Sequence, residues 1–426
     1  MHTSLPTTFC RRVTLATLLS LGSSAAALAQ VPAFSWAPAP DCALARSEAQ
    51  GIGLGNKLYV MSGFYNANYE VTLQAEVYDV VANTWTPMAN IPEAITHTGT
   101  VVDGDYLYIV GGYVGTHPGP ITDHAWRYHI PSNTWSPFVP LPAARGAGTL
   151  VRLDRELHFF GGCVRVNGTV LNDTPEHWTL NLDAATPAWV ARAPLPSPTN
   201  HLGGAALNGK VYAIGGQLLG DEGFGNQNTL FEYNPGTNTW TARANLPRGL
   251  GHITNSVFTL NNRIVVVGGR HNGWSLSANI VEYNPATNTW RDLTPLPTGL
   301  LSPVAGMAGG RLVVNGGDDG TAPVVATTWR SATALGTQPA RTDAGQLAVW
   351  PNPGAAPAQV LRFDSPLAGT FQIQVSDALG RTVAQRTASK PAGAVQQALA
   401  LDLRPGLYRI AVRQGEYQAS QKLVVE

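Results

Sequence analysis

One unit of about fifty residues recurs along most of this chain, and this period constrains the fold more than any other feature. The segments FEYNPGTNTW at 231–240 and VEYNPATNTW at 281–290 show the unit at its most regular. Five tryptophans occupy the same place in successive units, and each is followed seven residues later by a proline: Trp85, Trp135, Trp189, Trp240 and Trp290. Such even duplication indicates a structural unit that is built several times, because a catalytic motif is rarely repeated this regularly.

Each unit predicts four short strands. An apolar run closed by glycine, such as YAIGG at 212–216, predicts a strand buried on both faces. A tyrosine stands seven residues before the tryptophan in four units, and Leu182 takes that place in the third: Tyr78, Tyr128, Tyr233 and Tyr283. Between tyrosine and tryptophan, Asn-Pro begins a turn, and we expect Asn238 and Asn288 to adopt positive φ and complete a hairpin.

A single unit of this kind cannot bury both of its faces, so neighbouring units must stack. The glycine pairs allow strands to approach where a Cβ atom would clash. Tryptophan and tyrosine each bury roughly 150–250 Å² and can wedge between adjacent sheets. Radial stacking of four-stranded sheets produces a β-propeller, so the sequence predicts an all-β fold.

The glycine pair, the tyrosine, the tryptophan and the period together resemble kelch repeats over residues 30–330. Five complete units and a partial one at 301–330, which contains LVVNGG but no NTW turn, indicate a six-bladed kelch β-propeller. The segment FSWAPAP at 34–40 is expected to supply the missing outer strand of the last blade, which removes the exposed edges.

The N-terminus predicts export. Residues 1–29 form a candidate signal peptide, with Arg11 and Arg12, an apolar run at 13–21 and ALA at 27–29. No later segment reaches the eighteen or so apolar residues of a membrane helix, so no transmembrane segment is expected after cleavage. The formal net charge of zero, without a basic run, argues against a nucleic-acid partner.

The C-terminal part lacks the fifty-residue period of the repeats. Residues 331–345 are interpreted as a linker, and residues 346–426 predict a small immunoglobulin-like β-sandwich. This stretch resembles the type A sorting domain of the type IX secretion system. The residues that carry the resemblance are Pro351-Asn352-Pro353, Asp377 to Gly380, Gly406-Leu407-Tyr408 and Lys422 to Val425. The alternative is an ordinary immunoglobulin-like module with a ligand of its own.

The resemblance implies a route for the chain. The signal peptide would carry it into the periplasm, and the sorting domain would dock on the type IX outer-membrane machinery. The domain is usually removed there, and the cargo is released or attached to the cell surface. Two cysteines remain in the mature chain, Cys42 and Cys163, and an exported protein can pair them. Their distant places in the repeat favour two separate thiols, and the question stays open.

The loops after the Leu-Pro step carry one set of candidate ligand-binding residues. His97, His201 and His252 each stand five residues after their proline. Arginines occur in the same loops: Arg46, Arg145 and Arg248. Three histidines in related loops can be imagined as a metal site. They belong to separate blades without a close carboxylate, and kelch repeats often place Arg and His here. The sequence therefore predicts neither a metal nor another cofactor.

The loops after the glycine pairs carry a second set, in which aromatic faces mixed with polar groups suit sugars or peptides. Its members are Tyr65, Tyr69, His117, Arg165, Asp221, Glu222, Arg270, His271, Trp274, Asp318 and Asp319. We therefore expect a monomeric, secreted or surface-attached propeller that binds a glycan or an extracellular protein without catalysis.

Two enzymes with related propellers and one structural role are the alternatives. Galactose oxidase resembles the fold, and Cys163 follows a glycine pair, but the sequence offers no matching copper ligands. The bacterial N-acetylneuraminate mutarotase is closer in size, and Asp221 or Glu222 in GDEGFGNQN would act as the acid–base group, although the loop lacks the arginine. A surface-layer component would need no pocket.

The channel mouth discriminates between these roles. An acid and an arginine clustered there would favour the enzyme, and an aromatic rim would favour binding. A plugged channel with flat loops would favour the structural role.

Overall fold

The computed structural model describes residues 31–426 with short gaps, at 118, 167–169, 221–224, 272–274, 336–340, 343–346, 356–358, 366–368, 378–380, 391–392, 400 and 415–416. The predicted signal peptide at 1–29 therefore lies outside the described residues. All named elements are strands. Among the described residues, no helix is long and apolar enough to cross a membrane.

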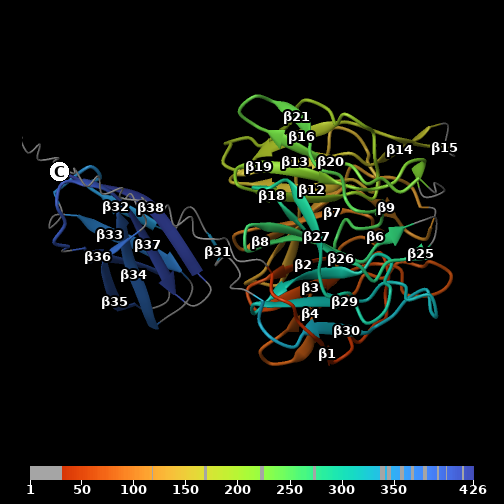
Figure 1. Cartoon of the computed structure of the whole chain (residues 1–426), viewed down its shortest axis with the longest axis horizontal. Coiled ribbons are helices and arrows are strands. Elements are labelled where there is room, and N and C mark those ends of the chain that lie inside the picture. The colour runs from red at the N-terminus through yellow and green to blue at the C-terminus, as the bar shows by residue number, and fades with distance from the viewer. Residues whose placement is uncertain are drawn as a thin grey trace, which may run out of the picture.

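Six four-stranded antiparallel sheets are built from residues 36–331 (Figure 1). The first has β2 (Gln50–Leu54), β3 (Lys57–Met61), β4 (Ala75–Asp79) and β5 (Thr84–Pro87); the second has β7 (Gly99–Asp103), β8 (Tyr106–Val110), β10 (Ala125–His129) and β11 (Thr134–Pro137); the third has β12 (Thr149–Leu153), β13 (Glu156–Phe160), β16 (His177–Asn181) and β17 (Trp189–Ala191). The fourth has β18 (Gly203–Leu207), β19 (Lys210–Ile214), β20 (Leu230–Asn234) and β21 (Thr239–Ala242); the fifth has β22 (Val257–Leu260), β23 (Arg263–Val267), β26 (Ile280–Asn284) and β27 (Thr289–Asp292).

The sixth sheet joins the two ends of the repeat region. It contains β28 (Val304–Ala308), β29 (Arg311–Asn315), β30 (Thr328–Ser331) and, as its outer strand, β1 (Trp36–Ala39), which pairs antiparallel with β30. The innermost strands contact one another in a closed circuit, β2–β7–β12–β18–β22–β28 and back to β2. The sheets therefore form a closed β-propeller around a central axis.

The repeated tryptophan joins each sheet to the preceding one. Its indole N–H donates to a backbone carbonyl just after the outer strand of the neighbouring sheet, at 2.6–3.2 Å. The six donor–acceptor pairs are Trp36–Pro295, Trp85–Pro40, Trp135–Ala89, Trp189–Val139, Trp240–Ala193 and Trp290–Ala244. These bonds form a second closed circuit, near the outer rim.

The asparagine of the NTW turn completes this contact in three of the sheets, through Asn133, Asn238 and Asn288. Asn238 has φ of 52°, accepts the Tyr233 hydroxyl hydrogen at 2.8 Å, and accepts the backbone N–H of Ala193 in the preceding sheet at 2.9 Å. Asn288 has φ of 54° and makes the corresponding bonds with Tyr283 and Ala244 at 2.7 and 2.9 Å. The positive φ expected for both asparagines is confirmed, and the repeated decapeptide is a hairpin that holds two sheets together.

The third sheet corrects one assignment. The sequence spacing placed Leu182 where the other units have tyrosine, but Leu180 is the residue that pairs with Trp189. The hairpin between β16 and β17 is two residues longer than its counterparts, so counting seven residues back from the tryptophan misses the register. Leu180 is fully buried, as the tyrosines are.

The second glycine of each pair lies close to the loop that leads into the innermost strand of its own sheet. At Gly112, φ is 114° and a Cβ atom would lie 2.3 Å from the carbonyl oxygen of Thr96. The backbone N–H of Gly216 donates to Leu250 O at 2.7 Å, and a Cβ there would lie 2.6 Å from Asn200 O. Only glycine fits these positions, which confirms the predicted reason for the glycine pairs.

A smaller β-sandwich is formed by the C-terminal residues. One sheet orders β31 (Arg341–Thr342), β38 (Tyr417–Val425), β37 (Gly406–Gln414), β34 (Gly369–Asp377) and β35 (Thr382–Lys390), and the other orders β32 (Leu347–Trp350), β33 (Val360–Ser365) and β36 (Gly393–Ala398). Leu361, Phe363, Phe371, Ile373 and Leu423 are part of the core between the two sheets. The Asn352 side chain donates to Lys422 O at 2.7 Å and accepts from Val424 N at 2.8 Å, which fixes β38 at its end.

Cys42 and Cys163 are both buried free thiols. The Cys42 thiol donates to Leu44 O at 3.1 Å, whereas Cys163 Sγ lies 2.9 Å from the hydroxyl of Tyr113. The two cysteines therefore have separate surroundings and do not pair.

Candidate functional site

Six equivalent loop residues surround the axis on one side of the propeller. Each precedes the innermost strand of its sheet, and each has positive φ between 49° and 56°: Glu48, His97, Ala147, His201, His252 and Ser302. We call these six residues the axial ring. Ala147 and Ser302 have the same backbone conformation as the three histidines, so the fold and not the side chain sets this conformation. The side chains at the six positions then determine the chemistry of the axial ring.

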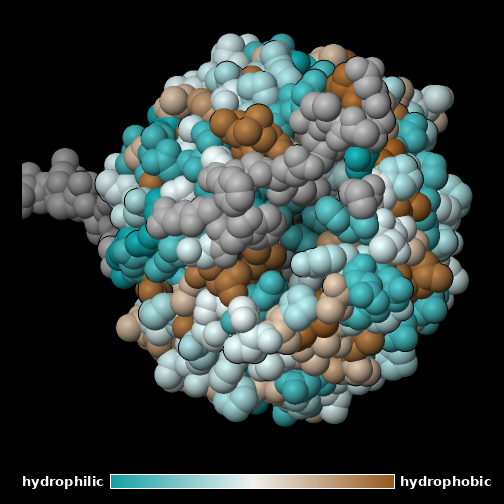
Figure 2. All heavy atoms as spheres, turned by 90° about the vertical axis from the view of Figure 1, so that its right-hand side faces the viewer, coloured by the Kyte–Doolittle hydropathy of each residue, from teal (hydrophilic) through white to brown (hydrophobic). Residues whose placement is uncertain are grey.

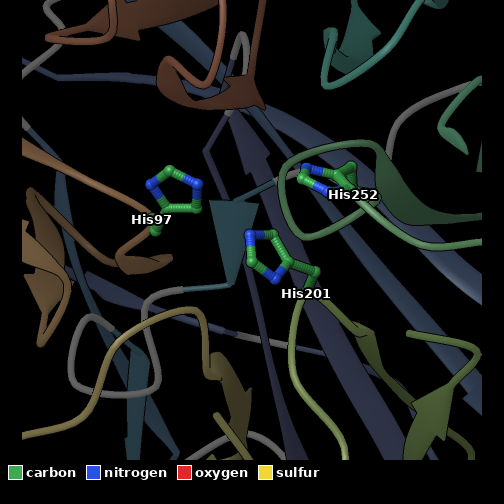
Figure 3. A group of neighbouring side chains, drawn as sticks. All are labelled: His97, His201 and His252. Atoms are coloured by element: carbon green, nitrogen blue, oxygen red, sulfur yellow. The ribbon is translucent and has the colours of Figure 1, made fainter. Parts of the chain in front are cut away.

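The three histidines of the axial ring converge on the axis (Figure 3). One ligand nitrogen of each lies within 4.8 Å of the other two, and all three side chains are buried. The imidazole centroids of His97 and His201 are 4.9 Å apart, and those of His201 and His252 are 4.1 Å apart. The three histidines belong to separate sheets, as the sequence predicted, but the six-fold arrangement brings their loops to one point, so this separation does not argue against a cluster.

Glu48 supplies a carboxylate to the same cluster. Its Oε1 accepts hydrogen bonds from His252 Nδ1 and Ser302 Oγ, both at 2.6 Å, and its Oε2 lies 3.6 Å from His97 Nε2. The sequence-based premise of no carboxylate near the histidines is therefore wrong. Burial raises the pKa of Glu48, but the charges of His97 and His252, the hydrogen bond from His252 and the charge of His201 outweigh it and hold the pKa below the usual range.

Side chains outside the axial ring orient the histidines. His97 Nδ1 lies 2.8 Å from Thr96 Oγ1. The Asn200 amide donates from Nδ2 to Asp173, so its Oδ1 faces His201 Nδ1 and accepts from it. Asp173 in turn accepts the backbone N–H groups of Leu219 and Gly220 at 2.7 and 3.1 Å. A chain of hydrogen bonds from a carboxylate through an amide therefore fixes the His201 imidazole.

The axial ring narrows one end of the propeller channel. A cavity of about 10 Å³, lined in part by Glu48, His97, His252 and Ser302, lies at the axial ring and has room for about one water molecule or small ion. Beyond it, the six innermost strands line a channel cavity of about 340 Å³. Between the two, Gln50 Oε1 accepts from Thr98 N and Oγ1 and from Asn255 Nδ2, at 2.9–3.2 Å.

Three of the candidate arginines have structural partners inside the propeller. Arg46 is fully buried and pairs with Glu76, and burial lowers its pKa. Arg145 lies 3.2 Å from Glu176 and 4.7 Å above the ring of Trp178. Arg270 is fully buried and donates to Gln217. A ligand on the surface would not reach these groups without displacing their partners.

The remaining polar candidates lie nearer to solvent and apart from the axial ring. Arg248 pairs with Asp292 at 2.9 Å, and Arg165 donates to Gly119 O at 3.1 Å. Asp318 accepts the N–H of Gly320 at 2.7 Å. His271 is half-buried and ends β24 (Arg270–His271), which pairs with β25 (Ser275–Leu276). Asp221, Glu222 and Trp274 lie outside the described residues.

Tyr69 belongs to an aromatic group that reaches the axial ring. Tyr69 is 47% exposed, and its ring centroid lies 5.4 Å from Phe64 and 6.0 Å from His117. Phe64 continues inward to His97, at 5.9 Å. Tyr65 is 36% exposed and donates to Glu70 at 2.7 Å. The aromatic group therefore connects the surface of the first sheet with the axis.

Sequence reasoning missed Glu48, Ser302, Asn200 and Tyr113. Ser302 could have been found, because it stands five residues after Pro297, as the histidines do after their prolines. Glu48 has no such proline before it, so only the closed ring reveals its equivalence. The ring centroids of Tyr113 and His97 are 5.0 Å apart, and Tyr113 directly follows the glycine pair of the second sheet.

Family comparisons agree with this architecture. The family model described as the KLHDC2/KLHL20/DRC7 Kelch-repeats domain matches residues 96–317, which is more than half of the chain. The chain belongs to the kelch-repeat family. The model of the Secretion system C-terminal sorting domain matches residues 348–426 of this kelch-repeat protein, which covers nearly all of the C-terminal sandwich. The combination that the motifs indicated is confirmed, and the chain is a kelch module with a secretion sorting domain.

Curated relatives match about half of the chain. A kelch repeat-containing protein of Arabidopsis thaliana is 26% identical over 56% of this chain and 59% of its own length. The Kelch-like protein terF of Aspergillus terreus is 26% identical over 59% of this chain and 57% of its own length. Kelch-like protein 36 of Mus musculus is 28% identical over 44% of this chain and 30% of its own length. The kelch-repeat protein thus spans less than two thirds of each of these relatives.

Proposed function

We propose that this kelch-repeat protein is a secreted or surface-attached binding module that recognises an extracellular protein or glycan without chemical conversion. The recognition face is the one that carries the axial ring and the loops after the glycine pairs. The observation that carries the proposal is the aromatic group of Tyr69, Phe64 and His117, which presents exposed ring surface beside the channel mouth.

Other exposed apolar side chains lie in loops of the same kind. Val166 is 38% exposed at the end of β14 (Cys163–Val166), which pairs with β15 (Val170–Asp173), and Leu219 is 70% exposed in the loop after Gly216. Figure 2 views this face, and its apolar groups are scattered among hydrophilic ones around a hollow near the centre. Aromatic and apolar anchors with a polar surround are typical of recognition surfaces.

The enzymatic alternative has weaker support from the described residues. A mutarotase-like site would combine an acid with an arginine at the channel mouth. The acid there is Glu48, and the partners described for it are His252, Ser302 and His97. The arginines described nearby, such as Arg46 and Arg270, are bound elsewhere. The geometry therefore favours recognition over acid–base catalysis.

The test is a binding screen with the mature chain on glycan and peptide arrays, followed by variants. Tyr69→Ser removes the exposed ring, and we expect it to weaken binding of the selected ligand about tenfold or more. Val81→Ser is the matched control, because Val81 is 73% exposed in the turn between β4 and β5, away from the loop face. Equal binding by the wild type and Tyr69→Ser, or turnover of an arrayed glycan, would contradict the proposal.

A further inference from the structure

We propose that the three histidines of the axial ring bind one divalent ion of a late first-row transition metal, represented by Zn²⁺, and that Glu48 orients His252 from outside the coordination shell. This site lies on the propeller axis and is distinct from the aromatic surface that the proposed function uses. Two lines of geometry carry it: convergence of the donor nitrogens and orientation of the imidazoles by outer hydrogen bonds.

The donor set suits these ions. Imidazole nitrogens bind zinc, copper and nickel well, and three of them with one water molecule make a four-coordinate N₃O site. Around a tetrahedral Zn²⁺ with Zn–N bonds of 2.0–2.1 Å, ligand nitrogens lie about 3.3 Å apart. The nitrogens observed here lie within 4.8 Å of one another, so modest reorientation of buried imidazoles closes the difference.

The hydrogen bonds at Nδ1 turn the metal-binding nitrogens inward. Asn200 Oδ1 can only accept, so the His201 imidazole carries its hydrogen on Nδ1 and its lone pair on Nε2. The Glu48 carboxylate likewise accepts from His252 Nδ1, which places the lone pair of that imidazole on Nε2. Such outer partners accompany metal-binding histidines, because they fix both the tautomer and the ring orientation.

Glu48 supports the site from outside the coordination shell. Its Oε1 is engaged by His252 and Ser302, at 2.6 Å each, which holds the carboxylate in place behind the His252 imidazole. Its Oε2 lies 3.6 Å from His97 Nε2 and places negative charge beside the histidines. A cavity of about 10 Å³, lined in part by Glu48, His97 and His252, lies next to the cluster. An ion bound by the three histidines joins loops of the second, fourth and fifth sheets, and Glu48 links the first sheet to them.

The experiment uses the full mature chain with a purification tag that contains no histidine. After treatment with a chelator and its removal, Zn²⁺ is titrated at pH 7.5 by calorimetry, and Co²⁺ is titrated by visible absorption as a spectroscopic stand-in. We expect one ion per chain, a Co²⁺ spectrum of four-coordinate type and a Tm that rises with Zn²⁺ concentration. A wild-type chain that binds no stoichiometric ion overturns the proposal.

Variants locate the ion. His201→Gln removes one ligand, and we expect Zn²⁺ affinity to fall about 100-fold or more. Asn200→Ala keeps every ligand and removes only the orienting amide, with an expected loss of about tenfold. His124→Gln is the matched control, because His124 also faces a glutamate, Glu93, at 2.9 Å on the surface. Loss of binding in His124→Gln instead of the ring variants would overturn the proposal.

Foldedness is checked by near-ultraviolet circular dichroism of each metal-free variant. If His201→Gln does not fold, His97→Asn and Asn200→Ala provide the same test at other points of the site. Unchanged Zn²⁺ affinity in any folded ligand variant counts against the site, and a graded loss from Asn200→Ala to the ligand variants supports it.

Discussion

The Nδ1 atom of His252 lies 2.6 Å from Oε1 of Glu48, although 204 residues separate the two in the chain. The bond links loops of the first and fifth sheets, which are not neighbours in the ring of inner strands. Ser302 of the sixth sheet, which lies between them, donates to the same oxygen. One buried carboxylate oxygen therefore ties together three sheets at the point where the propeller closes.

Removal of this carboxylate is expected to destabilise the propeller. In the metal-free chain, Glu48→Ala leaves the His252 imidazole and the Ser302 hydroxyl without their acceptor in a buried place, and we expect a loss of about 2–4 kcal/mol in the free energy of unfolding. Urea denaturation monitored by tryptophan fluorescence measures it. Glu70→Ala, which removes an exposed carboxylate from the first sheet, should leave the midpoint nearly unchanged. Similar midpoints for both variants would refute the closing role.

The NTW asparagine is expected to be the most sensitive polar residue of each hairpin. Asn238→Ala removes acceptors for Tyr233 and Ala193 and places an alanine at φ of 52°, so we expect a loss of about 2–3 kcal/mol in unfolding free energy. Asn234→Ala is the matched control four residues away, because Asn234 bonds only locally to Gly236 at 3.1 Å, and should cost about 1 kcal/mol or less.

Asn238→Gly separates the two causes. Glycine accepts positive φ without strain, so this variant should recover the conformational part of the loss but not the hydrogen bonds. Thermal unfolding of the three variants side by side measures the partition. If glycine restored full stability, the bonds to the neighbouring sheet would contribute nothing.

The difference between these two features explains what the sequence could predict. The asparagine contact is local and repeated, so four copies of NTW and the positive-φ preference of asparagine were enough to predict its hairpin. The axial ring depends on closure: His97, His201 and His252 meet only because six loops point to one axis, and Glu48 lies before the first complete unit. Leu182 shows that even a local repeat can mislead. The hairpin of the third sheet is two residues longer, so Leu180 and not Leu182 pairs with Trp189.

A buried histidine pair in the third sheet predicts acid sensitivity. His158 Nδ1 and His177 Nε2 lie 3.0 Å apart, and burial, with smaller contributions from Arg192 and from the neighbouring histidine, lowers the pKa of His158 to about 4 and that of His177 to about 3. In the unfolded chain both titrate near pH 6.5. Between pH 6.5 and 4 the unfolded state therefore binds protons that the folded state does not, so stability falls as the pH falls.

From pH 7 to pH 5.5 this pair should reduce the free energy of unfolding by about 2 kcal/mol. Carboxylates contribute little there, because they titrate at lower pH. The measurement is urea denaturation at both pH values for the wild type, for the double variant His158→Gln/His177→Gln and for the control His129→Gln, whose histidine lies at the surface beside Ser132. An identical pH dependence in the double variant would show that other groups carry it.

The two cysteines should react only when the propeller unfolds. Cys163 has no exposed surface and Cys42 has 5%, and burial raises the pKa of the Cys42 thiol, so its reactive thiolate is scarce. We expect no reaction with a thiol reagent such as DTNB in the native mature chain and two thiols per chain in guanidinium chloride. One or no thiol in the denatured, unreduced protein would indicate a disulfide that the structure does not contain.

The sorting domain should be necessary for delivery outside the cell. Deletion of residues 346–426 leaves the six sheets intact, since their cores lie within residues 31–335, and removes the matched sorting domain. We expect the truncated chain to accumulate in the periplasm of a host that has a type IX system, as measured by immunoblots of cell fractions and medium. Asn352→Ala, which releases the end of β38 by removing its bonds to Lys422 and Val424, should reduce secretion while the domain remains present. Arg386→Gln, a change on the middle of β35 that leaves this end untouched, serves as the control. Normal appearance of the truncated chain in the medium would mean that the propeller carries its own export signal and that the C-terminal domain serves another purpose.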